Sequence, residues 1–267
     1  MPVEPASAVS RTRRAIVVAC ALLATLPSQA AGRLTLAAAS NLKFAMDELV
    51  GEFRAAHPGE RVEVVYGSSG KLHAQILNGA PFDLFFSADM ALPQDLAARG
   101  LAASPVRRYA MGRLVIWSAA NDAAKLSLAD LAAPRFTRIA IANPAHAPYG
   151  QRAVEALRAA GVWETVEPRL VYGENVAQTA QFVESGNATA GIIPLSLARN
   201  PALAARGGYA LVPDALHEPL AQGFIITQRA AGNALAAAFA QFVASDPARQ
   251  VLIRYGFASA PVAADGG

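Results

Sequence analysis

Short apolar runs alternate with amphipathic stretches along most of this chain. Residues 34–39 form a continuous apolar run, which is typical of a buried strand. Leu42, Met46 and Leu49 then recur at the spacing of one helix face, and the sequence His-Pro-Gly at 57–59 ends that pattern. This first segment therefore predicts a strand followed by a helix.

The same alternation continues to the end of the chain. It predicts further strands at residues 62–66, 83–87, 114–117, 139–142, 170–172, 192–193, 209–212 and 224–227. It predicts helices after residue 70 and at residues 91–99, 127–131, 151–160, 177–184, 235–244 and 247–255. Strand–helix alternation with short loops indicates an α/β fold whose parallel sheets are covered on both faces.

Four polar turns each follow an apolar run and precede a helical pattern. Helix N-termini carry unpaired N–H groups and the positive end of the helix dipole, so they bind anions. In parallel sheets they also lie at the edge where ligands bind. We therefore expect these turns to converge on a small oxyanion, with Ser40 also acting as an N-cap. The turns are Ser40-Asn41, Ser68-Ser69-Gly70, Pro148-Tyr149-Gly150 and Asn175-Val176.

The first thirty residues have the pattern of a secretory signal peptide. Three arginines, at 11, 13 and 14, precede an apolar run at 15–26 that is too short to span a bilayer, and small residues lead up to Ala30. We predict cleavage after Ala30, with Ala31 as the neighbouring choice, and a periplasmic mature protein. Three alternatives remain open: lipidation at Cys20, a twin-arginine signal, and a buried N-terminal helix.

Removal of this segment changes the chemistry open to the chain. Cys20 is the only cysteine, so the mature chain has no disulfide, zinc–thiolate site or cysteine nucleophile. Three of the 23 basic residues leave with it and one of the 20 acidic residues, so the mature chain is almost neutral. The three lysines are scattered and the four histidines lie far apart, which argues against a nucleic-acid surface and a histidine metal site.

Five stretches together match a known family. The chain resembles the periplasmic molybdate-binding proteins of ABC uptake transporters, over nearly all of its mature length. The matching stretches are Ala37-Ala38-Ala39-Ser40-Asn41-Leu42, Gly67-Ser68-Ser69-Gly70-Lys71-Leu72, Gly79-Ala80-Pro81-Phe82-Asp83-Leu84-Phe85-Phe86-Ser87-Ala88-Asp89, Ile141-Ala142-Asn143-Pro144-Ala145-His146-Ala147-Pro148-Tyr149-Gly150 and Arg254-Tyr255-Gly256-Phe257.

The resemblance implies a two-lobed type II periplasmic binding protein, in which each lobe is a mixed, mostly parallel sheet flanked by helices. Residues 31–112 and 223–267 would form lobe I, and residues 113–222 lobe II. The expected protein is a monomer that captures molybdate or tungstate and delivers it to a membrane ABC permease. It is not an enzyme and has no cofactor, and molybdenum enters only as molybdate. A binder of sulfate or phosphonate, an exported hydrolase and a ligand-sensing module are the alternatives.

The resemblance also implies a set of ligands. Ser40 matches the first-loop hydroxyl and Asn41 supplies a backbone N–H. Ser69 matches the second-loop serine, with Ser68 as an alternative, and Val176 matches the backbone donor of the fourth turn.

The chain departs from many family members at one ligand. Those members have a tyrosine hydroxyl where this chain has Pro194, and proline has neither a hydroxyl nor an N–H to donate. They have a small residue where this chain has Tyr149. We infer that Tyr149 supplies the hydroxyl from the third loop instead.

Overall fold

The structure is a computed structural model that describes residues 32–119 and 123–258 together with Met1. The chain divides into two units, Met1–Gly32 and Arg33–Gly267, and all elements named below belong to the second. Apart from Met1, the predicted signal peptide lies outside the described residues.

The first sheet contains five strands in the order β2-β1-β3-β10-β4. β1 pairs in parallel with β2 and β3, whereas β10 runs antiparallel to both β3 and β4. The strands are β1 (Arg33–Ala39), β2 (Arg61–Gly67), β3 (Leu84–Ser87), β4 (Arg107–Gly112) and β10 (Leu220–Ile226). The predicted strands at 34–39, 62–66 and 83–87 are confirmed, and β4 is an additional strand.

The second sheet also contains five strands, in the order β7-β6-β8-β5-β9. β6 pairs in parallel with β7 and β8, whereas β5 runs antiparallel to β8 and β9. The strands are β5 (Leu114–Ser118), β6 (Ile139–Ala142), β7 (Leu170–Gly173), β8 (Ala190–Pro194) and β9 (Gly208–Leu211). The predicted α/β fold with mixed sheets is confirmed, but parallel and antiparallel pairings are equally common among the described strands rather than mostly parallel.

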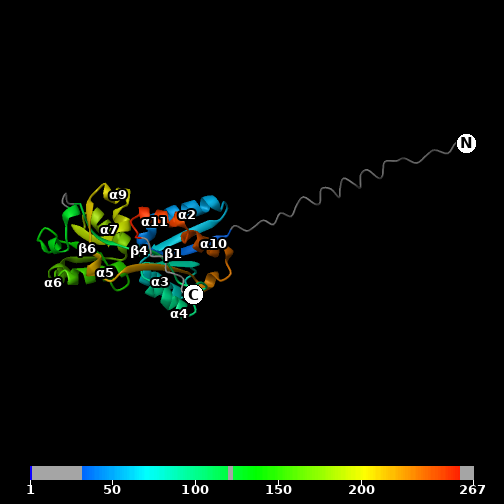
Figure 1. The fold of residues 1–267 in the computed structure, drawn as a ribbon, viewed down its shortest axis with the longest axis horizontal. Helices are drawn as coiled ribbons and strands as arrows, with labels where there is room; N and C mark the ends of the chain where they lie inside the picture. Colours follow the sequence, from blue (N-terminus) through cyan, green and yellow to red (C-terminus); the bar gives the residue numbers. More distant parts are fainter. Residues whose placement is uncertain (2–31, 120–122, 259–267) are drawn as a thin grey trace. The chain divides into compact units, whose positions relative to one another are not determined.

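Helices cover both faces of the first sheet, because successive side chains of a strand point to opposite faces. Leu84 and Phe86 pack on one side with α2 (Lys43–Ala56), α10 (Ala234–Val243) and α11 (Asp246–Arg254). Phe85, between them, packs on the other side with α3 (Ser69–Leu77) and α4 (Ala91–Ala98). Figure 1 shows α3 and α4 on the side of β1 opposite α2 and α11.

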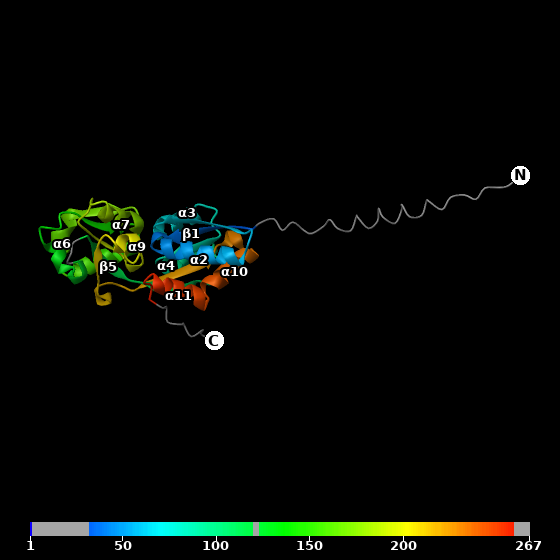
Figure 2. The same ribbon diagram turned by 90° about the horizontal axis from the view of Figure 1, so that it is seen from above.

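The second sheet is buried more completely. Every residue of β5, β6 and β8 is buried. The flanking helices are α5 (Pro148–Ala159), α7 (Val176–Glu184) and α8 (Leu195–Ala198). Figure 1 labels α5 and α7 near β6, and Figure 2 labels α7 near β5. The remaining short helices are α6 (Trp163–Val166), α9 (Pro201–Ala204), η1 (Ser40–Leu42), η2 (Ala123–Lys125), η3 (Ala129–Ala132), η4 (Glu167–Arg169), η5 (Asp214–Leu216) and η6 (Gln228–Ala230).

The chain passes between the sheets twice. The first passage is at Arg113, between the end of β4 and the start of β5, beside the predicted lobe boundary between residues 112 and 113. The second precedes β10, which is already part of the first sheet at Leu220, whereas the predicted lobe boundary lies between residues 222 and 223. The exact lobe boundaries remain a prediction.

The sheet register brings the polar turns together in pairs. β1 and β2 are neighbours, and Ala39 lies opposite Gly67, so the turns that begin at Ser40 and Ser68 are adjacent. β6 and β7 are also neighbours, and Ala142 lies opposite Gly173, so the turns that lead into α5 and α7 are adjacent too. All four turns thus follow the carboxyl ends of parallel strands, as the sequence predicted.

Candidate oxyanion-binding site

The four polar turns meet at one small cavity, named here the donor cavity. Its volume of about 10 Å³ is about enough for one water molecule, far below the about 300–1,000 Å³ of sites for drug-sized ligands. Four of the five predicted ligands line it, and Ser40 does not. The lining residues are Asn41, Gly67, Ser68, Ser69, Ala88, Ala147, Pro148, Tyr149 and Val176.

Ser40 is buried beside the donor cavity, but it is not an N-cap. It lies inside η1, where Ala39 occupies the N-cap position and no side chain caps the helix. Its hydroxyl instead donates to the carbonyl of Gly67, with an Oγ–O distance of 3.0 Å. The predicted cap is therefore wrong, because the neighbouring strand offers this hydroxyl a carbonyl acceptor. The role of Ser40 as a ligand stays a prediction.

Asn41 contributes a buried amide to the wall of the cavity. Its Nδ2 donates to Gln222 Oε1 at 2.9 Å and lies 3.5 Å from the Tyr149 hydroxyl. Its Oδ1 is buried and has no hydrogen-bond partner in the described chain. The sequence suggested only a backbone donor here, so the side-chain contacts are new.

Ser69 is the first residue of α3 and presents two donors at the cavity. Backbone N–H groups of a first helical turn have no acceptor within the helix. The Ser69 hydroxyl accepts a bond from the Ala88 N–H at 3.0 Å, which leaves its own proton available. Ser68 also lines the cavity, but its Oγ lies 2.9 Å from His146 Nδ1. Ser69 is therefore the better placed of the two predicted serines.

Tyr149 lies in the first turn of α5, after a proline at a position that favours helix initiation. Its side chain is buried, with only 2% exposed, and its oxygen accepts a hydrogen bond from Gln222 Nε2 at 2.9 Å. Burial raises the pKa of the Tyr149 phenol, so the hydroxyl keeps its proton. Among the described residues this hydroxyl has donors as partners but no acceptor, so its proton is available to an anion.

Val176 is the first residue of α7, and Asn175 caps this helix. The Asn175 side chain accepts from the N–H groups of Ala177 and Gln178 at 3.0 and 3.1 Å. These two donors are therefore satisfied, whereas the Val176 N–H has no acceptor within the helix. This leaves Val176 as the backbone donor nearest the start of α7.

Several polar residues near the cavity escaped the sequence analysis. Gln222 and Tyr109 are buried and linked by a hydrogen bond of 2.7 Å. Ser196 in α8, two residues after Pro194, donates to the Asn41 carbonyl at 2.8 Å. Gln222 could have been recognised, because it is the only side chain capable of hydrogen bonding in the otherwise apolar strand β10.

Further contacts hold the elements around the cavity together. The Gly70 N–H donates to the His146 carbonyl at 2.9 Å. An added Cβ at Gly70 would lie 2.7 Å from that same oxygen, so only glycine allows this approach. Lys71 forms an ion pair with Glu174, and His146 Nε2 lies 3.9 Å from the same carboxylate. The hydrogen bond from Lys71 lowers the pKa of the Glu174 carboxyl, which keeps it ionised.

We expect the Lys71–Glu174 pair to make only a small contribution to ligand affinity, because both side chains are about half exposed. Glu174→Gln should change the affinity for an oxyanion by less than about fivefold in either direction, and high salt should remove the difference. Titration calorimetry at low and high salt measures this. Glu184→Gln is the matched control. Glu184 forms an ion pair with Arg206, and neither residue lines the cavity. A change in affinity well above fivefold would contradict the expectation.

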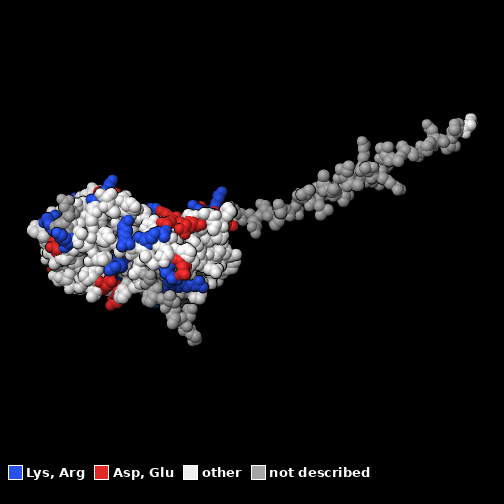
Figure 3. All heavy atoms as spheres, turned by 45° about the horizontal axis from the view of Figure 1, so that its top comes forward, with Lys and Arg blue, Asp and Glu red and all other residues white. Residues whose placement is uncertain are grey.

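The donor cavity is uncharged. No Lys, Arg, Asp or Glu is among the described residues that line it. Elsewhere on the surface, Figure 3 shows basic and acidic side chains close to one another on the visible face.

In residues 32–119 and 123–258, no cluster of His, Cys, Asp and Glu could hold a metal ion. No described helix is long and apolar enough to cross a membrane.

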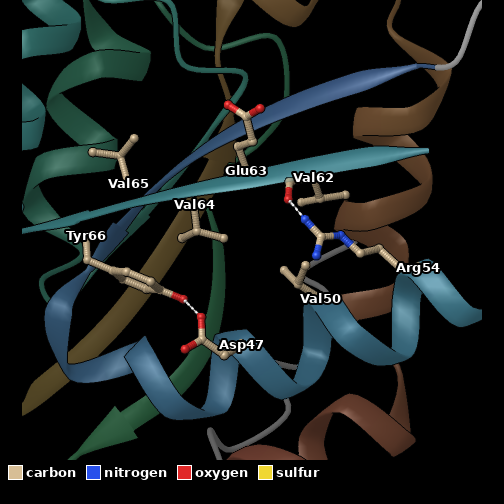
Figure 4. A pocket seen from close by; sticks show the side chains of 8 residues that line it. All are labelled: Asp47, Val50, Arg54, Val62, Glu63, Val64, Val65 and Tyr66. Atoms are coloured by element: carbon tan, nitrogen blue, oxygen red, sulfur yellow. Dashed lines mark hydrogen bonds between the residues drawn. The ribbon is translucent and has the colours of Figure 1, made fainter. Parts of the chain in front are cut away.

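A larger hollow than the donor cavity has the wrong chemistry for an anion. It is an open groove of about 550 Å³ between α2 and β2, and carboxylates of Asp47 and Glu63 line it (Figure 4). Tyr66 donates to Asp47 at 2.6 Å, and Arg54 donates to the Val62 carbonyl, so its polar groups bind one another. The carboxylates would repel a dianion. The smaller donor cavity is therefore the candidate site.

Comparison with known proteins places the whole site inside one family. The family model described as "Bacterial extracellular solute-binding protein" matches residues 34–258, which include all five predicted ligands. This chain belongs to that family. Members are binding proteins of transport systems and not enzymes, which agrees with the sequence analysis.

Two molybdate-binding proteins are similar to this chain over most of its length. The chain is 34% identical over 255 residues to the molybdate-binding protein ModA of Rhodobacter capsulatus, covering 92% of this chain and 97% of that protein. The periplasmic molybdate-binding protein of Azotobacter vinelandii is 32% identical in its solved structure, with a TM-score of 0.80, covering 85% of this chain and all of that chain.

A more distant solute-binding protein shares the fold alone. The sulfate-binding protein SubI of Mycobacterium tuberculosis H37Rv has a TM-score of 0.75 at 16% identity, covering 87% of this chain and 88% of that chain. The fold therefore does not decide which oxyanion a member binds, and the donors around the cavity must do so.

Proposed function

We propose that this protein captures molybdate, and also tungstate, between its two lobes and delivers it to a membrane ABC permease. The observation that carries the proposal is an uncharged cavity lined by hydroxyl and backbone donors at converging helix N-termini, in a chain related to molybdate-binding proteins. The proposed location is the periplasm, after removal of residues 1–30, and the proposed state is a monomer.

The proposed ligand set is Ser40, Asn41, Ser69, Tyr149 and Val176. Molybdate is a tetrahedral dianion without a proton at neutral pH, so a site that offers donors alone suits it. A hydrogen bond to a charged group contributes about 1.5–3 kcal/mol, so five donors supply on the order of 10 kcal/mol. Submicromolar binding requires about 8–12 kcal/mol. Neutral donors are therefore sufficient without a lysine or arginine.

Lobe closure is the proposed mechanism of capture. The proposed lobes are residues 31–112 with 223–267 and residues 113–222, except that Leu220–Gln222 pair with β4 in the first sheet. Ser40, Asn41 and Ser69 then belong to the first lobe, whereas Tyr149 and Val176 belong to the second. An anion that binds donors from both lobes stabilises the arrangement in which the lobes are together. The permease would recognise this arrangement.

Another oxyanion, such as sulfate or phosphonate, is the second candidate, because the same fold is found in a sulfate-binding protein. Protonated phosphate should bind less well, because its O–H takes the place of an acceptor in a cavity whose proposed ligands act as donors. Sulfate has the same charge and shape as molybdate but shorter bonds, so only cavity size distinguishes the two. Direct competition at equal concentrations separates these candidates.

Thermal unfolding with four anions tests the proposal. The mature protein is heated with molybdate, tungstate, sulfate or phosphate, each at about 1,000 times a micromolar Kd, which adds roughly 4 kcal/mol. For a chain of this size the midpoint should rise by roughly 8–16 °C. We expect this rise with molybdate and tungstate alone. A rise with sulfate alone would support the second candidate. No rise with any of the four would refute molybdate and tungstate as the ligands and would make phosphonates the next anions to test.

A further inference from the structure

Gln222 is a fully buried residue at the centre of a hydrogen-bond network beside the donor cavity. It lies in β10 with 0% of its surface exposed. Its side chain links three other elements: Tyr109 in β4, Asn41 in η1 and Tyr149 in α5. Gln222 does not line the cavity itself. Any influence on a ligand must therefore act through one of these partners.

Two donors determine which way the Gln222 amide faces. The Tyr109 hydroxyl donates to Oε1 at 2.7 Å, and Asn41 Nδ2 donates to the same oxygen at 2.9 Å. Burial raises the pKa of the Tyr109 phenol well above its usual value, so this donor keeps its proton. A reversed amide would place its NH₂ group against the Asn41 NH₂ group, which is unfavourable. With Asn41 Nδ2 facing Gln222, the orientation in the structure is therefore the favoured one.

This orientation has a consequence for Tyr149. With Oε1 occupied, Nε2 faces the Tyr149 oxygen and donates to it at 2.9 Å. A phenol that accepts from an amide still has its own proton to give. In the reversed orientation Tyr149 would donate that proton to Oε1 and would present only a lone pair to the cavity. The amide of Gln222 thus determines whether Tyr149 is a donor or an acceptor toward a ligand.

The backbone around Gln222 keeps this arrangement in place. The pairing of β10 with β4 shifts register between Gln222 and Gly223, an irregularity of the kind that redirects side chains near binding sites. An added Cβ at Gly112, in β4, would overlap both the Tyr149 hydroxyl and Gln222 Nε2. Glycine at this position therefore leaves the space in which the two side chains meet.

We propose that Gln222 is a positioning residue that makes the Tyr149 hydroxyl a proton donor toward the bound oxyanion. The proposal rests on the proposed function, because it assumes an anion in the donor cavity. Gln222 contributes no direct contact to the ligand. Its effect on affinity passes through Tyr149, so the two residues should be energetically coupled in binding.

A double-mutant cycle tests this coupling. Molybdate affinity is measured by titration calorimetry for the wild type, Gln222→Met, Tyr149→Phe and the double variant. Methionine keeps the length of the side chain but neither donates nor accepts strongly. We expect Gln222→Met to weaken binding at least tenfold in the wild-type background and less than about threefold in the Tyr149→Phe background. A merely structural role would produce the same loss in both backgrounds and would overturn the proposal.

Tyr109→Phe provides a second route if Gln222→Met does not fold, which circular dichroism without ligand would reveal. It removes the donor that orients Oε1 while keeping the ring. We expect Tyr109→Phe to weaken molybdate binding in the wild-type background. In the Tyr149→Phe background the same substitution should change the affinity very little. Equal losses in both backgrounds would again overturn the proposal.

The wild type separates the two proposals. If wild-type protein binds molybdate and the cycle shows no coupling, only the role of Gln222 fails. If it binds sulfate instead, the cycle is repeated with sulfate and decides the role of Gln222 independently of the ligand assignment. If it binds none of the four oxyanions, the proposed function fails and the role of Gln222 fails with it.

Discussion

Tyr149→Phe should weaken molybdate binding by about 1.5–3 kcal/mol, the contribution of a hydrogen bond to a charged group. This corresponds to a roughly 10- to 150-fold higher Kd. The ring is retained, so packing in α5 is preserved and the loss reports on the hydroxyl. Titration calorimetry on the mature protein measures the change.

Tyr172→Phe is the matched control for this experiment. Tyr172 lies in β7, is 46% exposed and does not line the donor cavity. Removing its hydroxyl should leave the affinity unchanged. If Tyr149→Phe also left the affinity unchanged, the Tyr149 hydroxyl would not be a ligand, and the missing hydroxyl at Pro194 would have no replacement in the third loop.

The pH dependence gives an independent check on Tyr149. A tyrosine hydroxyl can donate only while it is protonated, and burial raises the pKa of this phenol above its usual value of 10.0. The donor should therefore persist through the range in which an exposed tyrosine ionises. Molybdate affinity is measured against pH for the wild type and for Tyr149→Phe. We expect the wild type to show no decrease in affinity centred near pH 10 that Tyr149→Phe lacks. Such a loss would mean that the phenol ionises as an exposed one does.

Gly112→Ala should weaken molybdate binding at least as much as Tyr149→Phe does, and it should also lower the free energy of unfolding. The added methyl group would overlap the Tyr149 hydroxyl oxygen and Gln222 Nε2 and would lie 2.9 Å from Tyr149 Cζ. All of these atoms are buried, so they cannot move into solvent. Overpacking of this kind costs about 1–3 kcal/mol of unfolding free energy. Chemical denaturation and molybdate titration measure the two consequences.

Gly51→Ala is the corresponding control. Gly51 lies inside α2, is exposed, and has no atom within 4 Å of an added Cβ. Alanine should raise the unfolding free energy by about 0.5–1 kcal/mol and leave molybdate binding unchanged. If Gly112→Ala behaved in the same way, the close approach at Gly112 would not be needed to place Tyr149.

Much of the site could be predicted because it depends on local sequence patterns. An apolar run followed by a polar turn and a helical pattern gives a parallel strand with a helix N-terminus at its carboxyl end. The register of β1 with β2, and of β6 with β7, then brings those ends together. This is why Asn41, Ser69, Tyr149 and Val176 could be selected from sequence and are found around one cavity.

What the sequence could not predict depends on contacts between distant residues. β4 begins with two exposed arginines at the edge of its sheet and has no strong apolar pattern. The antiparallel direction of β10 follows from its neighbours β3 and β4 and not from its own apolar run. The Ser40 hydroxyl bonds the carbonyl of Gly67, which is 27 positions away. A serine that caps a helix and a serine that bonds a strand look the same in sequence.

The uncharged lining of the donor cavity bears on how the protein would behave as the surrounding medium changes. At 0.1 M ionic strength, mobile ions largely screen the attraction between exposed charges that lie more than about 10 Å apart. Hydroxyl and backbone dipoles that touch a buried ligand are screened much less. A carrier that works outside the cytoplasm meets water whose salinity the cell does not regulate. No Lys or Arg is among the described residues that line the cavity, so the affinity for an anion would change little between low and high salt concentrations.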